Sequence, residues 1–204
     1  MRFAPLVAAL ALLPMSSVHG DDMVEDVGDF LPTYFAELQD VERDGDKAYV
    51  FGVGGLAIMN IEDPANPFMM GRYIPPADPF ERIYRGTVDL GHAYAGARED
   101  GLWVIDVVPF SEPVLTTVIG EPGVSYEGSA VDDDLLFACR HAHGLEILDL
   151  AGPGYPVSVA EVTELVNSWD AAARDGWVFV ADGLGGLAVV DAREPTAPQI
   201  AAVH

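Results

Sequence analysis

The chain has 204 residues, half of them hydrophobic, with 33 acidic and 10 basic residues and a formal net charge of −23. This composition excludes an intrinsically disordered polymer, and the acidity argues against binding to nucleic acid or anionic lipid. A single cysteine, Cys139, excludes an internal disulfide framework, so packing must supply the stability.

The N-terminus has the pattern of a secretory signal peptide. Arg2 is followed by an apolar run over residues 3–14 and a short stretch of small and polar residues before Asp21. The run is shorter than the roughly 20 apolar residues of a bilayer span. We therefore expect residues 1–20 to be a cleaved signal peptide, with an uncleaved anchor as the alternative. Residues 21–37 then form an acidic and aromatic leader, and the protein is secreted, periplasmic or at the cell surface, with no membrane span.

From residue 38 onward the sequence repeats. Each repeat has a Gly-Leu pair, an apolar run closed by Asp or Asn four residues after the Leu, and a proline eleven residues after the Leu. The pairs recur at intervals of 46, 43 and 42 residues and are Gly55-Leu56, Gly101-Leu102, Gly144-Leu145 and Gly186-Leu187. This phasing predicts four repeats, at about residues 38–80, 81–123, 124–166 and 167–204.

Each repeat is predicted to contain four short strands. A short run opens the unit, and a second, β-rich run begins at Ala48, Ala93, Leu135 or Trp177. The third strand follows the Gly-Leu pair, and its closing Asp or Asn suits an Asx turn. The fourth strands are expected at residues 68–74, 114–119, 157–162 and 199–203. Glycines between the second and third runs favour a hairpin there.

The third strands are apolar on successive residues, which is typical of strands covered on both faces. Antiparallel four-stranded sheets buried on both faces and recurring in series predict an all-β fold, a β-propeller-like array of four four-stranded antiparallel blades. Neither terminal repeat has a polar cap, because residues 56–59 and 187–190 are as apolar as the interior copies. We therefore expect one of two arrangements. Either repeat 1 contacts repeat 4 in a closed ring, or the chain is a partial propeller whose two ends meet additional blades from a partner or from further sequence.

Three segments carry a resemblance to a known family. The runs LAIMNIEDPANP, LWVIDVVPFSEP and GWVFVADGLGGLAVVDAREPTAP resemble the LVIVD repeat of bacterial secreted and surface proteins. The resemblance extends over roughly residues 38–204. It implies a propeller-type fold in an exported protein, and it implies no general activity and no catalytic residues.

The sequence contains no nucleophile elbow, phosphate-binding loop or paired zinc motif. Cys139, His141 and His143 alternate, so in an extended chain their side chains would share one side and could approach a soft metal. The simpler interpretation is a buried cysteine beside two solvated histidines. We assign no metal site, and the sequence identifies no cofactor.

Antiparallel topology places the hairpins between second and third strands on the same side as the crossovers between repeats. The crossovers carry aromatic and charged residues just before each first strand. These candidate ligand-contacting residues are Tyr84, Arg85, Tyr126, Glu127, Trp169 and Asp170. They have two possible uses, recognition of a ligand around a channel mouth or packing between neighbouring blades.

These features favour an exported, non-enzymatic repeat protein that acts as a binding or cell-surface interaction scaffold. Its partner would be a protein or a small ligand on the hairpin and crossover side. One alternative is a propeller-type hydrolase or lyase with a cation at the channel mouth. Another is a fragment of a longer propeller, which would self-associate if its ring is incomplete.

Overall fold

The protein is described by a computed structural model that covers residues 37–76 and 81–204, so the predicted signal peptide and nearly all of the predicted leader lie outside the described residues. Four antiparallel four-stranded sheets, which we number blades 1 to 4, make up the fold. Blade 1 contains β1 (Leu38–Asp44), β2 (Lys47–Gly52), β3 (Gly55–Asn60) and β4 (Phe68–Tyr73). Blade 2 contains β5 (Arg85–Asp89), β6 (His92–Gly96), β7 (Leu102–Asp106) and β8 (Val114–Ile119). Blade 3 contains β9 (Ser129–Asp132), β10 (Leu135–Cys139), β11 (Leu145–Asp149) and β12 (Val157–Val162). Blade 4 contains β13 (Asp170–Arg174), β14 (Trp177–Ala181), β15 (Leu187–Asp191) and β16 (Gln199–Val203), with the short 3-10 turn η1 (Gly183–Gly185) between β14 and β15.

The strands follow the sequence prediction closely. The fourth strands β8, β12 and β16 span the expected residues, and β4 ends one residue early, at Tyr73. Within each blade, consecutive strands pair antiparallel in the order first to fourth. The predicted all-β, propeller-like array is therefore confirmed.

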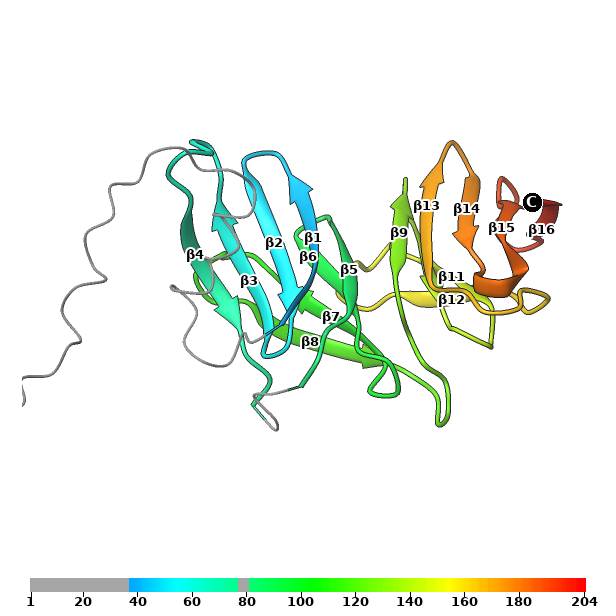
Figure 1. Cartoon of the computed structure of the whole chain (residues 1–204), viewed down its shortest axis with the longest axis horizontal. Helices are drawn as coiled ribbons and strands as arrows, with labels where there is room; N and C mark the ends of the chain where they lie inside the picture. The colour runs from blue at the N-terminus through cyan, green and yellow to red at the C-terminus, as the bar shows by residue number, and fades with distance from the viewer. Residues whose placement is uncertain (1–36, 77–80) are drawn as a thin grey trace, which may run out of the picture.

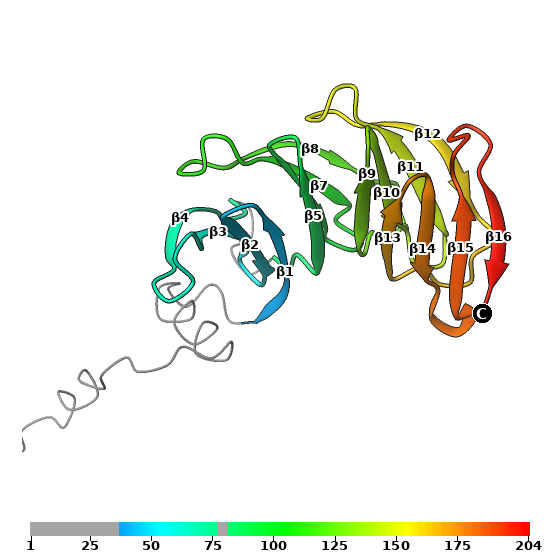
Figure 2. The ribbon, with the colours of Figure 1, turned by 90° about the horizontal axis from the view of Figure 1, so that it is seen from above.

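The blades follow one another along an open arc (Figure 2), with first strands on its concave side. Strand β1 contacts β5, β5 contacts β9, and β9 contacts β13. Blades 1 and 4 lie at opposite ends of the arc (Figure 1). Among the described residues, extensive strand contacts between blades join consecutive blades only. The expected closed ring is therefore wrong for a single chain, because four blades at these angles do not bring the ends together.

Apolar cores lie between successive blades. Each blade has a forward face turned to the next blade and a backward face turned to the previous one. Between blades 1 and 2, for example, Tyr49 and Leu56 of the first forward face pack with Trp103 of the second backward face. Equivalent cores join blades 2 and 3 and blades 3 and 4. This arrangement explains why the third strands are apolar on successive residues.

The closing Asp or Asn of each third strand forms the expected Asx turn. Its Oδ1 atom accepts a hydrogen bond from the backbone N–H two residues later, at 2.6–3.2 Å. The four residues are Asn60, Asp106, Asp149 and Asp191. Each repeat thus ends its third strand by the same local interaction.

Two features require the glycine of each Gly-Leu pair. The four residues have positive φ, between +82° and +114°, which strains any residue with a Cβ. A Cβ atom would also lie only 2.0–2.5 Å from a backbone carbonyl oxygen at the end of the fourth strand or just beyond it. These oxygens belong to Tyr73, Ile119, Val162 and His204.

Replacing Gly144 with alanine is expected to cost roughly 2–5 kcal/mol of unfolding free energy, from the left-handed backbone and the forced displacement of β12. Gly144 has φ +82° and its Cβ would meet the Val162 oxygen at 2.0 Å. Gly123 is a matched control, with φ +84° and no atom within 4 Å of its Cβ position. Its alanine variant should lose only about 1–2 kcal/mol. Urea denaturation measures the unfolding free energy of both variants. Equal losses of stability at the two positions would show that β12 moves aside freely.

Candidate functional site

The hairpins between second and third strands and the crossovers between blades form one surface, which we call the rim. Three isolated antiparallel bridges join each hairpin to the following crossover: Val53 to Arg82, Arg98 to Tyr126, and His141 to Ser168. Hairpins and crossovers therefore emerge on the same side, as the topology predicts. The six candidate residues all lie in these crossovers or at the first residue of the strand that follows.

Two of the candidates are buried. Tyr126 is 1% exposed, and its hydroxyl donates a hydrogen bond of 2.7 Å to Oε2 of Glu146 in β11. Glu127 is 3% exposed and lies 3.5 Å from the guanidinium Nε of Arg98 in the preceding hairpin. Both side chains therefore hold blades 2 and 3 together.

Arg140 is at the centre of this buried network. Its Nη1 and Nη2 atoms donate to the two carboxylate oxygens of Glu161, each at 2.9 Å, and Nη1 lies 3.5 Å from Oε2 of Glu146. Both Arg140 and Glu146 are at most 5% exposed. Burial, together with the bond to Glu146, raises the pKa of the Tyr126 hydroxyl. Sequence reasoning missed this network, although Glu146 interrupts a third strand that is otherwise apolar.

Tyr84 is half-buried between two guanidinium groups. The Arg98 guanidinium carbon lies 3.9 Å from the centroid of the Tyr84 ring, and that of Arg82 lies 5.5 Å from it. Arg82 in turn pairs with Glu37 at 3.0 Å. The side chains of Arg82 and Arg98 remain 41% and 39% exposed, so this stack is accessible from solvent.

Arg85, Trp169 and Asp170 meet on the concave side of the arc. From blade 2, Arg85 reaches past blade 3, with Nε 3.7 Å from Oδ2 of Asp170 and Nη1 3.4 Å from the carbonyl oxygen of Trp169. The Trp169 ring packs edge-on against His141, at 4.7 Å between centroids. Burial raises the pKa of Asp170, and Arg85 opposes that rise. These residues bring blades 2, 3 and 4 into one half-exposed group.

Among the described residues, no blade packs against the forward face of blade 4. Its centre is formed by apolar residues from all four strands: Ala172, Phe179, Ala181, Leu187, Val189 and Ala202. The register also places Asp170, Arg174, Trp177 and Asp191 on this face. Leu187 is 44% exposed, whereas Leu56, Leu102 and Leu145 at the same repeat position are fully buried. The prediction that every third strand is covered on both faces is therefore wrong for the last blade, because the cover comes from the following blade.

The LVIVD repeat family model matches residues 37–74 and 167–202, which contain blades 1 and 4. These two segments are LVIVD repeats. No curated protein sequence matches it. The two interior repeats carry the same Gly-Leu pair, closing Asp and proline, and they form the same four-stranded sheet.

Solved structures similar to the LVIVD-repeat chain show the fold alone. The computationally designed Ika8 protein matches with a TM-score of 0.62 and 12% identity, over 82% of this chain and 49% of that one. AztD from Citrobacter koseri matches with a TM-score of 0.53 and 14% identity, over 80% of this chain and 46% of that one. A chain of the nidogen/laminin complex matches with a TM-score of 0.59 and 10% identity, over 85% of this chain and 65% of that one. The LVIVD-repeat chain thus spans about half the length of Ika8.

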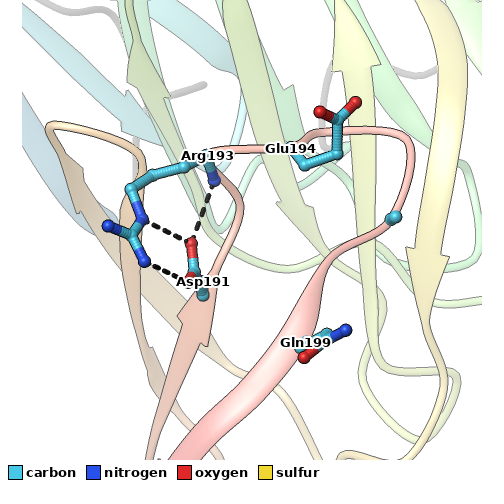
Figure 3. A pocket seen from close by; sticks show the side chains of 5 residues that line it. Asp191, Arg193, Glu194 and Gln199 are labelled. Atoms are coloured by element: carbon cyan, nitrogen blue, oxygen red, sulfur yellow. Dashed lines mark hydrogen bonds and ion pairs between the residues drawn. The ribbon is translucent and has the colours of Figure 1, made fainter.

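A shallow pocket lies at the loop between β15 and β16 of the LVIVD-repeat chain (Figure 3). Its lining includes Asp191 and Arg193, whose Nε and Nη2 atoms donate to the two Asp191 oxygens at 2.8 and 2.6 Å. This side-chain hydrogen bonding lowers the pKa of Asp191 to about 2. The guanidinium also lies 4.6 Å from the Trp177 ring centroid. Because Arg193 and Asp191 are paired with each other and Asp191 closes the Asx turn, the pocket is best explained as part of the turn.

The three residues considered for a soft metal diverge in the LVIVD-repeat structure. Cys139 is fully buried on the forward face of blade 3, and burial raises the pKa of its thiol. His141 packs on Trp169, and His143 is exposed in the hairpin. Within residues 37–76 and 81–204, no three His, Cys, Asp or Glu side chains are grouped to hold a metal ion. In the same part of the chain, no helix has the length and apolarity to cross a membrane.

Proposed function

We propose that this LVIVD-repeat chain is an exported, non-enzymatic interaction scaffold whose rim binds a protein partner. The observation that carries the proposal is that the rim contains two kinds of side chain, one buried and one half-exposed. The buried charged groups connect blades, while an aromatic and guanidinium surface remains half-exposed on the same side. The proposal of export is supported by the signal-peptide pattern of residues 1–20, and the proposed location is secreted, periplasmic or at the cell surface.

The composition of the exposed rim supports a protein partner. Arginine, tyrosine and tryptophan are the residues most often found at the energetic centres of protein interfaces. Four of the ten basic residues of the chain lie on the rim, at positions 82, 85, 98 and 140, and the first three have side chains about 40% exposed. The rest of this strongly acidic chain offers few such groups, so the rim is chemically distinct.

The pairing of the rim acids favours a scaffold over the hydrolase or lyase alternative. A catalytic acid or base must reach a substrate atom, but Glu127 is buried against Arg98 and Glu146 is held by Tyr126 and Arg140. Asp182 is 2% exposed and accepts the backbone N–H groups of Val166 and Asn167 at 2.9 and 2.7 Å. These carboxylates are already used to hold loops and blades in place.

Photo-crosslinking tests the proposal in cells that produce the chain. Benzoylphenylalanine placed at Tyr84 or Trp169 is expected to capture the same discrete partner protein. The same group at Phe68, which is 54% exposed on β4, serves as the control and should not capture it. The partner, once identified and purified, should bind the purified chain at least tenfold more weakly after Arg82→Ala and Arg98→Ala together. Unchanged affinity, or identical products from all three positions, would show that the rim is not the recognition surface.

A further inference from the structure

Arg85 of blade 2 and Asp170 of blade 4 form an ion pair that crosses the blade between them. Arg85 begins β5 and Asp170 begins β13, and β9 of blade 3 contacts both strands (Figure 2). The Arg85 Nε atom lies 3.7 Å from Oδ2 of Asp170, and Nη1 donates to the Trp169 carbonyl oxygen at 3.4 Å. The pair therefore joins two blades that are not neighbours in the arc.

The absence of a side chain at Gly128 in blade 3 makes room for this pair. Gly128 has the same repeat position as Arg85 and Asp170, because the residue before each of them donates its backbone N–H to the last carbonyl oxygen of the second strand. The φ angle of Gly128 is not positive, so its backbone conformation does not require glycine. A Cβ atom at Gly128 would overlap Oδ1 of Asp170, so the carboxylate fills the space that a side chain would take.

Acidic residues of blade 1 lie close to the same pair. Asp40 of β1 accepts the backbone N–H of Gly86, the residue after Arg85, at 3.2 Å. Burial raises the pKa of Asp170, and the charge of Asp40 adds to that rise. Burial raises the pKa of Glu42 as well, with further contributions from Asp40 and Asp170. Without the charge of Arg85, these carboxylates would repel one another across the concave side.

We propose that the Arg85–Asp170 pair, which we call the clasp, fixes the spacing of the two half-exposed aromatic residues of the rim. Tyr84 directly precedes Arg85, and Trp169 directly precedes Asp170. Each aromatic residue is therefore joined through the backbone to one end of the clasp. Arg85 and Asp170 are positioning residues, because they set where the two rings are presented. The effect on partner binding rests on the function proposed above, whereas the effect on spacing does not.

Two spin labels on the rim measure the spacing that the clasp sets. Glu99→Cys and Leu184→Cys place them on the hairpins of blades 2 and 4, where both residues are exposed. Cys139 is fully buried and should not be labelled. Pulsed dipolar spectroscopy should show a longer mean distance after Arg85→Met, because this change removes the clasp and leaves Asp170 facing the blade 1 carboxylates. Asp170→Asn should lengthen it less, since it removes one of the repelling charges together with the clasp. High salt should reduce the difference between the two variants.

Gly128→Ala tests the clasp without altering a charge. The added methyl group should displace the Asp170 carboxylate and lengthen the same distance, and the chain should stay folded because the displaced atom is the end of a side chain. Gly152→Ala in the same blade is the matched control, because its Cβ would meet only the Tyr155 carbonyl oxygen, at 3.9 Å. This variant should leave the distance unchanged. Melting curves show that each variant is folded.

Partner binding tests the positioning role separately. The protein captured by photo-crosslinking should bind the Gly128→Ala chain about threefold to tenfold more weakly than the Gly152→Ala chain, because its two aromatic contacts are no longer held at a fixed spacing. An unchanged distance in both Arg85→Met and Gly128→Ala would overturn the clasp. A longer distance with unchanged affinity would overturn the positioning role and leave the rim as the binding surface. If the rim were not the binding surface, the distance measurement would still decide whether the clasp exists.

Discussion

Replacing Leu145 with alanine is expected to lower the free energy of unfolding by about 2–5 kcal/mol, because the substitution removes buried methyl groups and leaves a cavity. Leu145 is fully buried between blades 3 and 4, in contact with the apolar side chains of both. The same substitution at Leu187 should cost less than about 1 kcal/mol, because this side chain is 44% exposed and no blade covers it. Both residues begin a third strand after a glycine, so the pair isolates the contribution of the neighbouring blade.

Urea denaturation at low protein concentration measures both variants as monomers. The midpoint should move far more for Leu145→Ala than for Leu187→Ala, with the slope unchanged in both. Equal losses at the two positions would mean that Leu187 is also covered in the monomer. The open forward face of blade 4 would then be wrong.

Replacing Arg140 with methionine is expected to cost about 3–5 kcal/mol, since it leaves buried Glu146 without its cationic partner. The loss also removes the bidentate contact to Glu161. Arg193→Met is the matched control, because its pair with Asp191 is exposed at the surface. Exposed pairs contribute about 0–1 kcal/mol, so this variant should be close to wild type.

A double variant tests whether the cost comes from the unpaired charge. Arg140→Met combined with Glu146→Leu should recover much of the stability lost by Arg140→Met alone, because paired apolar replacements of a buried ion pair are often neutral. Thermal unfolding of the unaltered chain, the two single variants and the double variant gives the four stabilities of a double-mutant cycle. Additive losses would instead show that Arg140 stabilises the rim mainly through Glu161.

Some of the rim residues predicted to contact a ligand are buried, so they cannot contact a partner. Glu127 matches Tyr84 in repeat position, yet Glu127 is buried and Tyr84 is half-exposed. Glu127 lies against the guanidinium of Arg98, and Tyr126 takes the position of buried Ile83 with its hydroxyl bonded to Glu146. The partner surface proposed above therefore consists of Arg82, Tyr84, Arg85, Arg98 and Trp169.

The sequence by itself determined the local structure of this protein. Each Gly-Leu pair specifies a hairpin because only glycine tolerates positive φ so close to the fourth-strand carbonyl. Each closing Asp or Asn specifies an Asx turn through a bond to an N–H two residues away. These interactions act within one blade, so they could be predicted from residue spacing, and the four sheets followed from their repetition.

Only the tertiary structure decided which of the repeated residues are buried and which are exposed. The third strands at Leu145 and Leu187 have the same pattern, but one is covered and the other is open. Burial depends on the neighbouring blade, and the angles between blades leave the arc open instead of closing it into a ring. The Arg140 network joins residues from three separate segments, and no local pattern encodes that meeting. Contacts between distant segments depend on how whole sheets pack, which residue spacing within a repeat does not specify.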